Sequence, residues 1–91
     1  MPRISVVIPV YNSRETIAKC LDSLMVQDHP SFETIVVDDG SIDETAEICE
    51  SYKGITVIRV EQGGPSRARN IGVKASKGEL IAFTDGDCIV D

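Results

Sequence analysis

Four short apolar runs, rich in β-branched residues, recur at regular intervals along the chain. They occupy residues 4–10, 33–38, 55–60 and 79–84. Each has the length of a strand and is bounded by turn-forming residues, whereas the segments between them carry helical spacing. Strands that alternate with helices form a parallel sheet with right-handed crossovers. We therefore expect an α/β fold with three layers, α/β/α, built on a four-stranded parallel sheet like the first half of a Rossmann-type domain.

The intervening segments predict helices with defined ends. The first carries one apolar stripe, made of Ile17, Cys20, Leu21 and Leu24. Asn12, with Glu15 three residues later, predicts a capping box at its start. Ser41 and Glu44 predict the same arrangement for the second helix. Pro65 is a good first-turn residue for the third helix.

The pattern within the runs predicts their places in the sheet. Residues 4–10 and 33–38 are almost continuous in Ile and Val, as expected for strands covered on both faces. Residues 55–60 alternate more and are expected nearer an edge. A chain of 91 residues suits one small domain, and we take residues 1–91 as that single domain.

Charge and composition exclude several classes of protein. The chain has 9 basic and 15 acidic residues, a net charge of −6, which argues against a nucleic-acid-binding surface. No apolar run approaches the roughly 20 residues of a membrane span, and the apolar N-terminus lacks a signal-peptide cleavage site. Three widely spaced cysteines favour a reducing, cytoplasmic setting over a disulfide framework or a zinc site.

Polar or glycine-bearing residues follow each predicted strand. Ligands of open α/β sheets bind beyond the carboxyl ends of the strands, so these are the positions to search. The turn after the first strand, residues 9–12, contains no glycine, which excludes a dinucleotide-binding G-x-G-x-x-G turn there. The chain has no P-loop motif either. Tyr11 offers a ring on which a nucleobase could stack, or is a packed tyrosine at a strand end.

Two pairs of acidic residues have two interpretations each. Asp38 and Asp39 favour the start of a following helix, or they bind donor groups of a ligand such as a base N–H or a ribose hydroxyl. Asp85 and Asp87 flank a glycine at the end of the fourth run. They form a polar turn or converge on one hard cation, Mg²⁺ or Mn²⁺.

The basic residues of the third helical segment form the one basic cluster of the chain: Arg67, Arg69, Lys74 and Lys77. A solvated surface accounts for the two lysines. The two arginines fall in the first turns of the predicted helix, where the helix dipole disfavours cations. That placement suggests an anionic partner nearby.

Taken together, four motifs resemble the nucleotide-sugar-binding half of an inverting family 2 glycosyltransferase with the GT-A fold. They are "ISVVIPVYN", "VVDDGSIDET", "GGPSRARNIGVKASKGE" and "LIAFTDGD", in the order and spacing of that family and over essentially the whole chain. The resemblance implies a nucleotide site made of Pro9, Tyr11, Asn12, Asp39, Arg69, Asn70 and Asp85. It also implies that Asp87, with Asp85, holds a divalent metal ion, Mn²⁺ or Mg²⁺, on the diphosphate.

The resemblance implies transfer of a sugar from a nucleotide-diphospho-sugar, a UDP-sugar in the usual case, to an acceptor hydroxyl with inversion. The general base and the acceptor-binding half of the family have no counterpart in these residues, so we expect a chain truncated at its C-terminus that is inactive alone. Exposed sheet edges predict self-association. The resemblance leaves open attachment of the intact protein to the cytoplasmic face of a membrane.

Two alternative functions share parts of this pattern. A free-standing, non-catalytic nucleotide-binding module would use the same residues and would differ from the transferase only beyond residue 91. A receiver-like signalling domain would need a phosphorylatable aspartate after the third strand, where this chain has Glu61, and a fifth strand followed by lysine. The signalling domain is therefore disfavoured.

Overall fold

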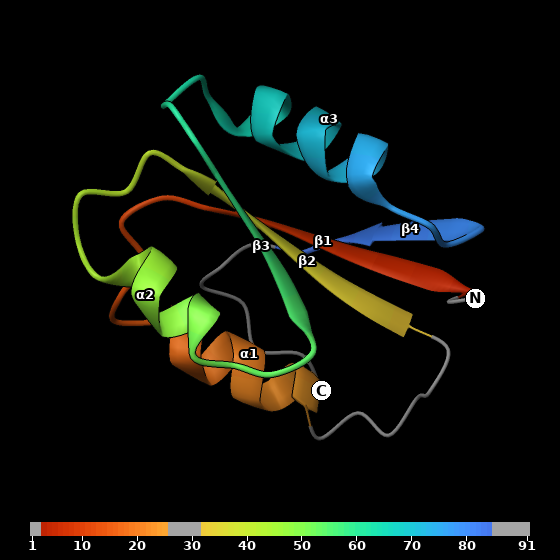
Figure 1. Cartoon of the computed structure of the whole chain (residues 1–91), viewed down its shortest axis with the longest axis horizontal. Coiled ribbons are helices and arrows are strands. Elements are labelled where there is room, and N and C mark those ends of the chain that lie inside the picture. Colours follow the sequence, from red (N-terminus) through yellow and green to blue (C-terminus); the bar gives the residue numbers. More distant parts are fainter. Residues whose placement is uncertain (1–2, 26–31, 85–91) are drawn as a thin grey trace.

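The structure is a computed structural model that describes residues 3–25 and 32–84. Strands and helices alternate as β1 (Ile4–Val10), α1 (Ile17–Met25), β2 (Phe32–Asp39), α2 (Thr45–Glu50), β3 (Ile55–Val60), α3 (Pro65–Ala75) and β4 (Leu80–Phe83). The strands form one parallel sheet in the order β3-β2-β1-β4 (Figure 1). The predicted fold class and four-stranded parallel sheet are confirmed.

Helices cover both faces of the sheet, because strands are added on one side of β1 first and on its other side last. Strands β1, β2 and β3 follow one another toward one edge, with α1 and α2 against the same face. The chain then returns through α3, on the opposite face, to place β4 on the other side of β1 (Figure 1). The result is the predicted three-layer arrangement.

The two central strands are buried on both sides. Ile8 and Val36 pack with the apolar stripe of α1, whereas Ile35 and Val37 pack beneath α3. Alternation along a strand sends successive side chains to opposite faces, so a strand covered twice is apolar at every position. The continuous Ile and Val runs of β1 and β2 follow from this placement.

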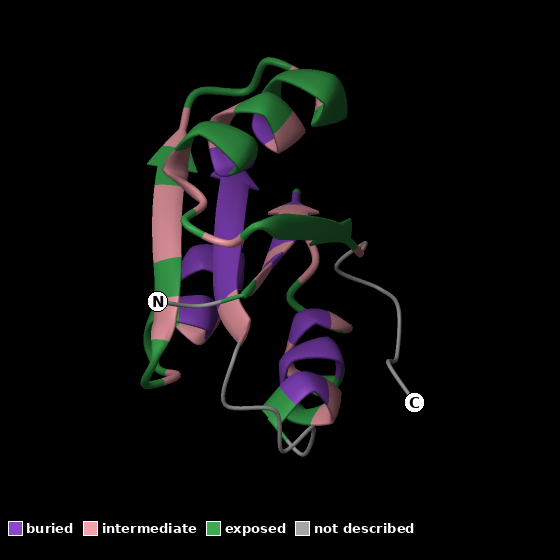
Figure 2. Ribbon diagram, turned by 90° about the vertical axis from the view of Figure 1, so that its right-hand side faces the viewer, coloured by how far each residue is buried: buried purple, intermediate pink, exposed green. Residues whose placement is uncertain are grey.

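The outer strands of the described sheet differ from the central ones. Strand β3 has no fully buried residue, which agrees with its predicted edge position. All four residues of β4 are exposed, and Figure 2 shows this strand in green beside the buried centre of the sheet. Leu80 and Phe83 of β4 are 56% and 51% exposed. An edge strand with apolar, exposed side chains is a surface suited to pairing or packing.

Helix α3 approaches β1 closely at Gly72. A Cβ atom at this position would lie 2.3 Å from Cγ1 of Val7, far inside van der Waals contact. Val7 is fully buried in β1 and has a short, stiff side chain that cannot move aside. The glycine therefore sets the distance between the third helix and the sheet.

The register brings three strand ends to one edge of the sheet. Val10 lies opposite Asp38, which lies opposite Arg59, and Asp39 lies opposite Val60. The fourth strand joins the same edge, because the Thr84 N–H donates to the carbonyl of Val7 at 3.2 Å. The loops that follow these strands therefore meet at the carboxyl edge.

Candidate functional site

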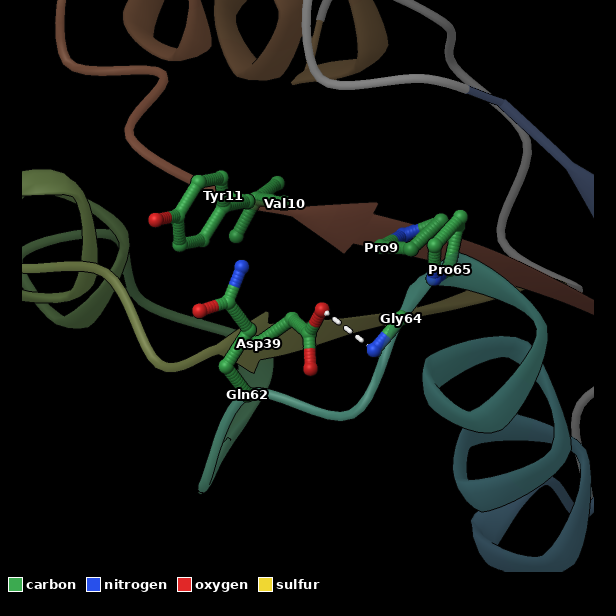
Figure 3. Close-up of a pocket in the computed structure, with 7 residues that line it drawn as sticks. All are labelled: Pro9, Val10, Tyr11, Asp39, Gln62, Gly64 and Pro65. Atoms are coloured by element: carbon green, nitrogen blue, oxygen red, sulfur yellow. Dashed lines mark hydrogen bonds between the residues drawn. The ribbon is translucent and has the colours of Figure 1, made fainter.

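A pocket of about 300 Å³ opens at the carboxyl edge of the sheet, between the ends of β1 and β2 and the loop that leads into α3. Seven residues line it: Pro9, Val10, Tyr11, Asp39, Gln62, Gly64 and Pro65 (Figure 3). Its position is the one expected for ligands of an open α/β sheet. Three of the predicted nucleotide-binding residues, Pro9, Tyr11 and Asp39, come together here.

Asp39 is the charged residue of the pocket lining, and its carboxylate organises the loop before α3. One carboxylate oxygen accepts a hydrogen bond from the Gly63 N–H at 2.8 Å, and the other accepts one from the Gly64 N–H at 3.0 Å. Its residue exposure is 5%. A carboxylate has about four acceptor positions, so two remain for a ligand. Because an ionised carboxylate only accepts hydrogen bonds, it selects ligands that present a donor.

Tyr11 forms the opposite wall of the pocket. It follows β1 directly and is 44% exposed, so much of its ring is available for contact. A flat aromatic ring is a surface on which any nucleobase can stack, at about 1–3 kcal/mol per base. The pocket thus joins an aromatic wall with a buried hydrogen-bond acceptor.

Gln62 was not among the predicted site residues. It lies in the exposed loop between β3 and α3, and its side-chain amide extends toward Tyr11 and Val10 (Figure 3). An amide offers both a donor and an acceptor, which complements the acceptor-only Asp39. The available signal was its place just after a parallel strand; no spacing pattern marks it.

A close approach of two loops brings Gln62 to its position. Gly40, directly after β2, has φ of +78°, and a Cβ atom there would lie 2.7 Å from the backbone nitrogen of Gln62. Glycine adopts this conformation without strain and leaves room for the neighbouring loop. The glycine that ends "DDG" is thus explained by the packing of one site loop on another.

Of the other predicted nucleotide-binding residues, those that the structure describes do not line the pocket. Arg69 is half-buried and Asn70 exposed on α3, and neither lines the pocket. Asn12 lies in the loop after Tyr11, hydrogen-bonded to the loop after β2. Asp85 and Asp87 lie outside the described residues. Within residues 3–25 and 32–84 there is no cluster of three His, Cys, Asp or Glu that could hold a metal ion.

Arg67, one of the two arginines expected near an anion, lies beside the loop that borders the pocket. Arg67 is exposed, and its Nη1 donates to the carbonyl oxygen of Glu61 at 2.8 Å, across the loop that lines the pocket. Its guanidinium retains further donors on the solvent side. This contact places a positive charge beside the loop that borders the pocket.

The predicted capping boxes are wrong. Helix α1 begins at Ile17, and Oδ1 of Asn12 accepts a hydrogen bond from the Ile42 N–H instead of capping α1. Helix α2 begins at Thr45 without a side-chain cap from its N-cap residue, Glu44. Ser41 Oγ accepts from the Asn12 N–H. Side chains of types that often cap helices instead form hydrogen bonds between two loops here. Such side chains can bond to any nearby backbone group, and the nearest groups belong to the neighbouring loop.

Known proteins resemble this chain in sequence and in fold. The sequence matches the family described as glycosyl transferase family 2 over residues 5–91. It is 44% identical over 95 aligned positions to the glycosyltransferase AglE of Haloferax volcanii, covering 97% of this chain and 31% of that protein.

Two solved structures carry nucleotide sugars. The Staphylococcus aureus TarS fragment 1–349 in complex with UDP-GlcNAc has a TM-score of 0.89 and 41% identity, over 93% of this chain and 26% of that one. The mannosyltransferase PcManGT of Pyrobaculum calidifontis, in complex with GDP-Man and Mn²⁺, has a TM-score of 0.80 and 32% identity, over 94% and 28% of the two chains. The present chain therefore spans less than a third of the length of each of these proteins.

Proposed function

The chain belongs to glycosyl transferase family 2, and from that premise we propose that it is the donor-binding portion of an enzyme that transfers a sugar from a nucleotide-diphospho-sugar. The observation that carries this proposal is the pocket in which Tyr11 and Asp39 face one another at the carboxyl edge of the sheet. Relatives with this fold bind UDP-GlcNAc or GDP-Man. The chemistry of the pocket suits a nucleoside.

The donors and acceptors of the pocket support a proposal for the nucleobase. Uracil presents one N–H donor between two carbonyl acceptors. The free acceptor positions of Asp39 suit that donor, the amide N–H₂ of Gln62 suits a carbonyl, and Tyr11 supplies the stacking surface. Guanine also presents N–H donors, but it is larger and carries adjacent donors where uracil carries a second acceptor. We therefore propose a UDP-sugar as the donor.

Asp85 and Asp87 are proposed as the metal-binding pair. They follow Thr84 in the sequence. Thr84 is hydrogen-bonded to Val7, and Val7 precedes the pocket residue Pro9 by two positions in β1. Carboxylate oxygens are hard donors that suit Mn²⁺ and Mg²⁺, so the donor set fits. When bound, such an ion neutralises the charge that develops on the departing nucleoside diphosphate. PcManGT was solved with Mn²⁺ and its nucleotide sugar.

In the proposed reaction an acceptor hydroxyl attacks the anomeric carbon from the face opposite the leaving group, so that the anomeric configuration inverts. The bond from that carbon to the diphosphate oxygen breaks, and a base outside this chain takes the hydroxyl proton. The chain's own residues bind and orient: Asp39 and Tyr11 hold the nucleoside, while Arg69 and Asn70 of α3 are proposed to lie along it.

Calorimetry of UDP binding tests the proposal. We expect UDP to bind the 91-residue chain more tightly with Mn²⁺ than without it, and more tightly than ADP in either case. Asp87→Ala should remove the Mn²⁺ dependence, whereas Glu79→Ala, which deletes the same charge at an exposed position, should keep it. Equal affinity for UDP with and without Mn²⁺ in all three proteins would refute the metal assignment.

Binding without transfer is the second candidate function. The lining of the pocket already joins a stacking ring, Tyr11, with a hydrogen-bond acceptor, Asp39, which favours nucleotide binding by these residues. We propose that these 91 residues bind donor without transferring sugar. Release of UDP from a UDP-sugar in the presence of acceptor sugars, by this chain alone, would contradict that proposal.

Strand β4 supports a proposal of self-association. Its four residues are exposed and it ends the sheet within the described residues. Edge strands of this kind pair with other chains. We expect the 91-residue chain to form dimers or larger species in sedimentation. A single monomeric boundary at about 100 µM would argue against pairing.

The cellular location is also a proposal. Cys20 and Cys49 are buried thiols that form no disulfide bond with each other. Desolvation, and to a lesser extent the charge of Asp38, raises the pKa of the Cys49 thiol to about 12. Buried thiols of this kind suit a reducing compartment. In the part of the chain that the structure describes, no helix has the length and apolar character of a membrane span. We propose a cytoplasmic protein whose attachment to a membrane surface is tested by cell fractionation.

A further inference from the structure

Three consecutive backbone N–H groups after Tyr11 donate to side chains of the loop after β2 and of the first residue of α2. The N–H of Asn12 donates to Ser41 Oγ at 2.8 Å and that of Ser13 donates to Thr45 Oγ1 at 2.8 Å. The N–H of Arg14 donates to Asp43 Oδ2 at 3.4 Å. We call these six residues the loop clamp: Asn12, Ser13, Arg14, Ser41, Asp43 and Thr45.

The clamp closes in both directions. Oδ1 of Asn12 accepts the N–H of Ile42 at 2.9 Å, so Asn12 is bonded to the other loop through its backbone and its side chain. Its φ of +47° is uncommon for a residue other than glycine. Asparagine tolerates this conformation better than most side chains, and the two hydrogen bonds hold it there.

The acceptor side of the clamp is internally braced. Thr45 is fully buried, and its hydroxyl donates to Asp43 Oδ1 while accepting from Ser13. Asp43 Oδ1 also accepts the Thr45 N–H at 2.9 Å. Desolvation alone would raise the pKa of Asp43, but the hydrogen bonds from Thr45 and Arg14 outweigh it and lower that pKa. Removing one member therefore leaves a polar group unpaired, and a buried unpaired group is costly.

The clamp bears on the pocket through Tyr11. Val10, on one side, is fixed in the sheet and 3% exposed, while Asn12, on the other, is the first residue of the clamp. The ring between them is 44% exposed, so packing around the ring is incomplete. Hydrogen bonds on both sides therefore fix the backbone of Tyr11 and the point from which its ring projects.

We infer that Ser41, Asp43, Thr45 and Asn12 are positioning residues that hold Tyr11 as a preformed wall of the nucleotide pocket. The inference rests on the proposed function only in taking a nucleobase as the group that stacks on Tyr11. A ring fixed before binding loses less conformational freedom when a base stacks on it, so affinity is higher than for a mobile ring. Asn12 acts through Tyr11 instead of contacting the nucleotide.

Tyrosine emission measures the clamp directly. The chain has two tyrosines and no tryptophan, so Tyr52→Phe leaves Tyr11 as the source of tyrosine emission. In that background, Ser41→Ala and Thr45→Val should lower the fluorescence anisotropy of Tyr11 in the absence of nucleotide. Thr45→Ser, which keeps the hydroxyl, should restore the value of the unmutated loop.

A matched control distinguishes the effect of breaking the loop clamp from the effect of removing any serine hydroxyl. Ser51 Oγ donates to the Ile48 carbonyl at 2.6 Å at the other end of α2, and Ser51→Ala should leave the anisotropy unchanged. Ser41 is only partly buried, so Ser41→Ala keeps the test available even if Thr45→Val does not fold. Equal anisotropy for Ser41→Ala and Ser51→Ala, with unchanged circular dichroism, would overturn the inference.

Nucleotide affinity gives the second readout. Ser41→Ala should weaken UDP binding about threefold to tenfold, because a less well positioned ring loses part of the stacking contribution of one base. In a Tyr11→Ala background the same change should have no further effect, because the wall that it positions is gone. Additive losses in the two backgrounds would contradict the inference. Failure of the unmutated chain to bind UDP, with anisotropy lowered by Ser41→Ala, would refute the proposed function and leave the clamp standing.

Discussion

Ser5 donates its hydroxyl hydrogen to Oε2 of Glu33 at 2.5 Å, joining the start of β1 to the start of β2. The same carboxylate oxygen accepts the N–H of Lys77 at 2.6 Å, and Ser5 Oγ accepts the N–H of Gly78 at 2.8 Å. One carboxylate thus anchors the connection between α3 and β4 at the amino edge of the sheet, opposite the pocket.

This anchor predicts sensitivity to acid. The hydrogen bond from Ser5, followed by those from the backbone of Lys77, lowers the pKa of Glu33 below its ordinary value of 4.5, despite an opposing effect of desolvation. A lowered pKa in the folded state means stabilisation that is present above pH 4.5 and lost as the pH falls through the folded value. In urea unfolding between about pH 6 and pH 3, a window set by the ordinary pKa values of carboxyl groups, Glu33→Gln should lose less stability than the unmutated chain. Parallel curves for the two proteins would contradict the role of this carboxylate.

Gly72→Ala should destabilise the fold. The added methyl group would meet Val7 at 2.3 Å, so α3 must shift away from β1. Overpacking of this kind costs about 1–3 kcal/mol, which outweighs the helix propensity gained by replacing glycine, about 1 kcal/mol. Urea unfolding measures the loss. Lys74→Ala, at an exposed position of the same helix, should change stability by less than about 0.5 kcal/mol.

The hydrogen bond of the Tyr52 hydroxyl leads us to expect a loss of stability in strong base. This hydroxyl donates to Asp22 at 2.6 Å, and this hydrogen bond, with desolvation, raises the pKa of Tyr52 from 10.0 to about 12. Because the folded-state pKa is raised, the stabilisation is complete below pH 10.0 and is lost as the pH rises toward about 12. The ultraviolet absorbance of tyrosinate should show a step near pH 12 that disappears in Tyr52→Phe. A step that persists in this variant would refute the assignment.

Asp39→Asn should separate two roles of one carboxylate. The amide places an N–H₂ group where an oxygen now accepts from Gly63 or Gly64, so one hydrogen bond is lost and the chain is destabilised by about 1–3 kcal/mol. UDP binding should fall below detection, because the charged acceptor is gone. Asp38→Asn is the matched control: Asp38 is also buried, but it accepts the Ser41 N–H and does not line the pocket. It should lower stability while retaining measurable UDP binding.

The sheet and one half of the pocket could be predicted from the sequence because they depend on patterns along the chain. Continuous Ile and Val in β1 and β2 follow from burial on two faces. Parallel strands bring their carboxyl ends to one edge, so Tyr11 and Asp39 could be placed near each other without a structure. The resemblance to glycosyltransferases pointed to the same two residues.

The remainder depends on contacts between loops, which leave no pattern along the chain. Asn12 and Ser41 are separated by 29 residues in the sequence and joined by a hydrogen bond in space. Their residue types predict helix caps equally well, and only the packing of α1 and α2 on the same face decides otherwise. Gln62 was missed for a similar reason, since its place in the pocket depends on the turn at Gly40 beneath it.

The division of the core between the two faces of the sheet has a consequence for synthesis on the ribosome. Within residues 3–25 and 32–84, the cluster around Ile8, Leu21 and Val36, with the half-buried side chains that pack on it, uses residues no later than Val57. The cluster beneath α3 needs Ala68, Ile71 and Ala75. As the chain emerges from its N-terminus, one side of β1 and β2 can therefore close first. The other side keeps Ile35 and Val37 uncovered until α3 is made, and this nascent, half-covered sheet is the stage at which a chaperone has most to bind.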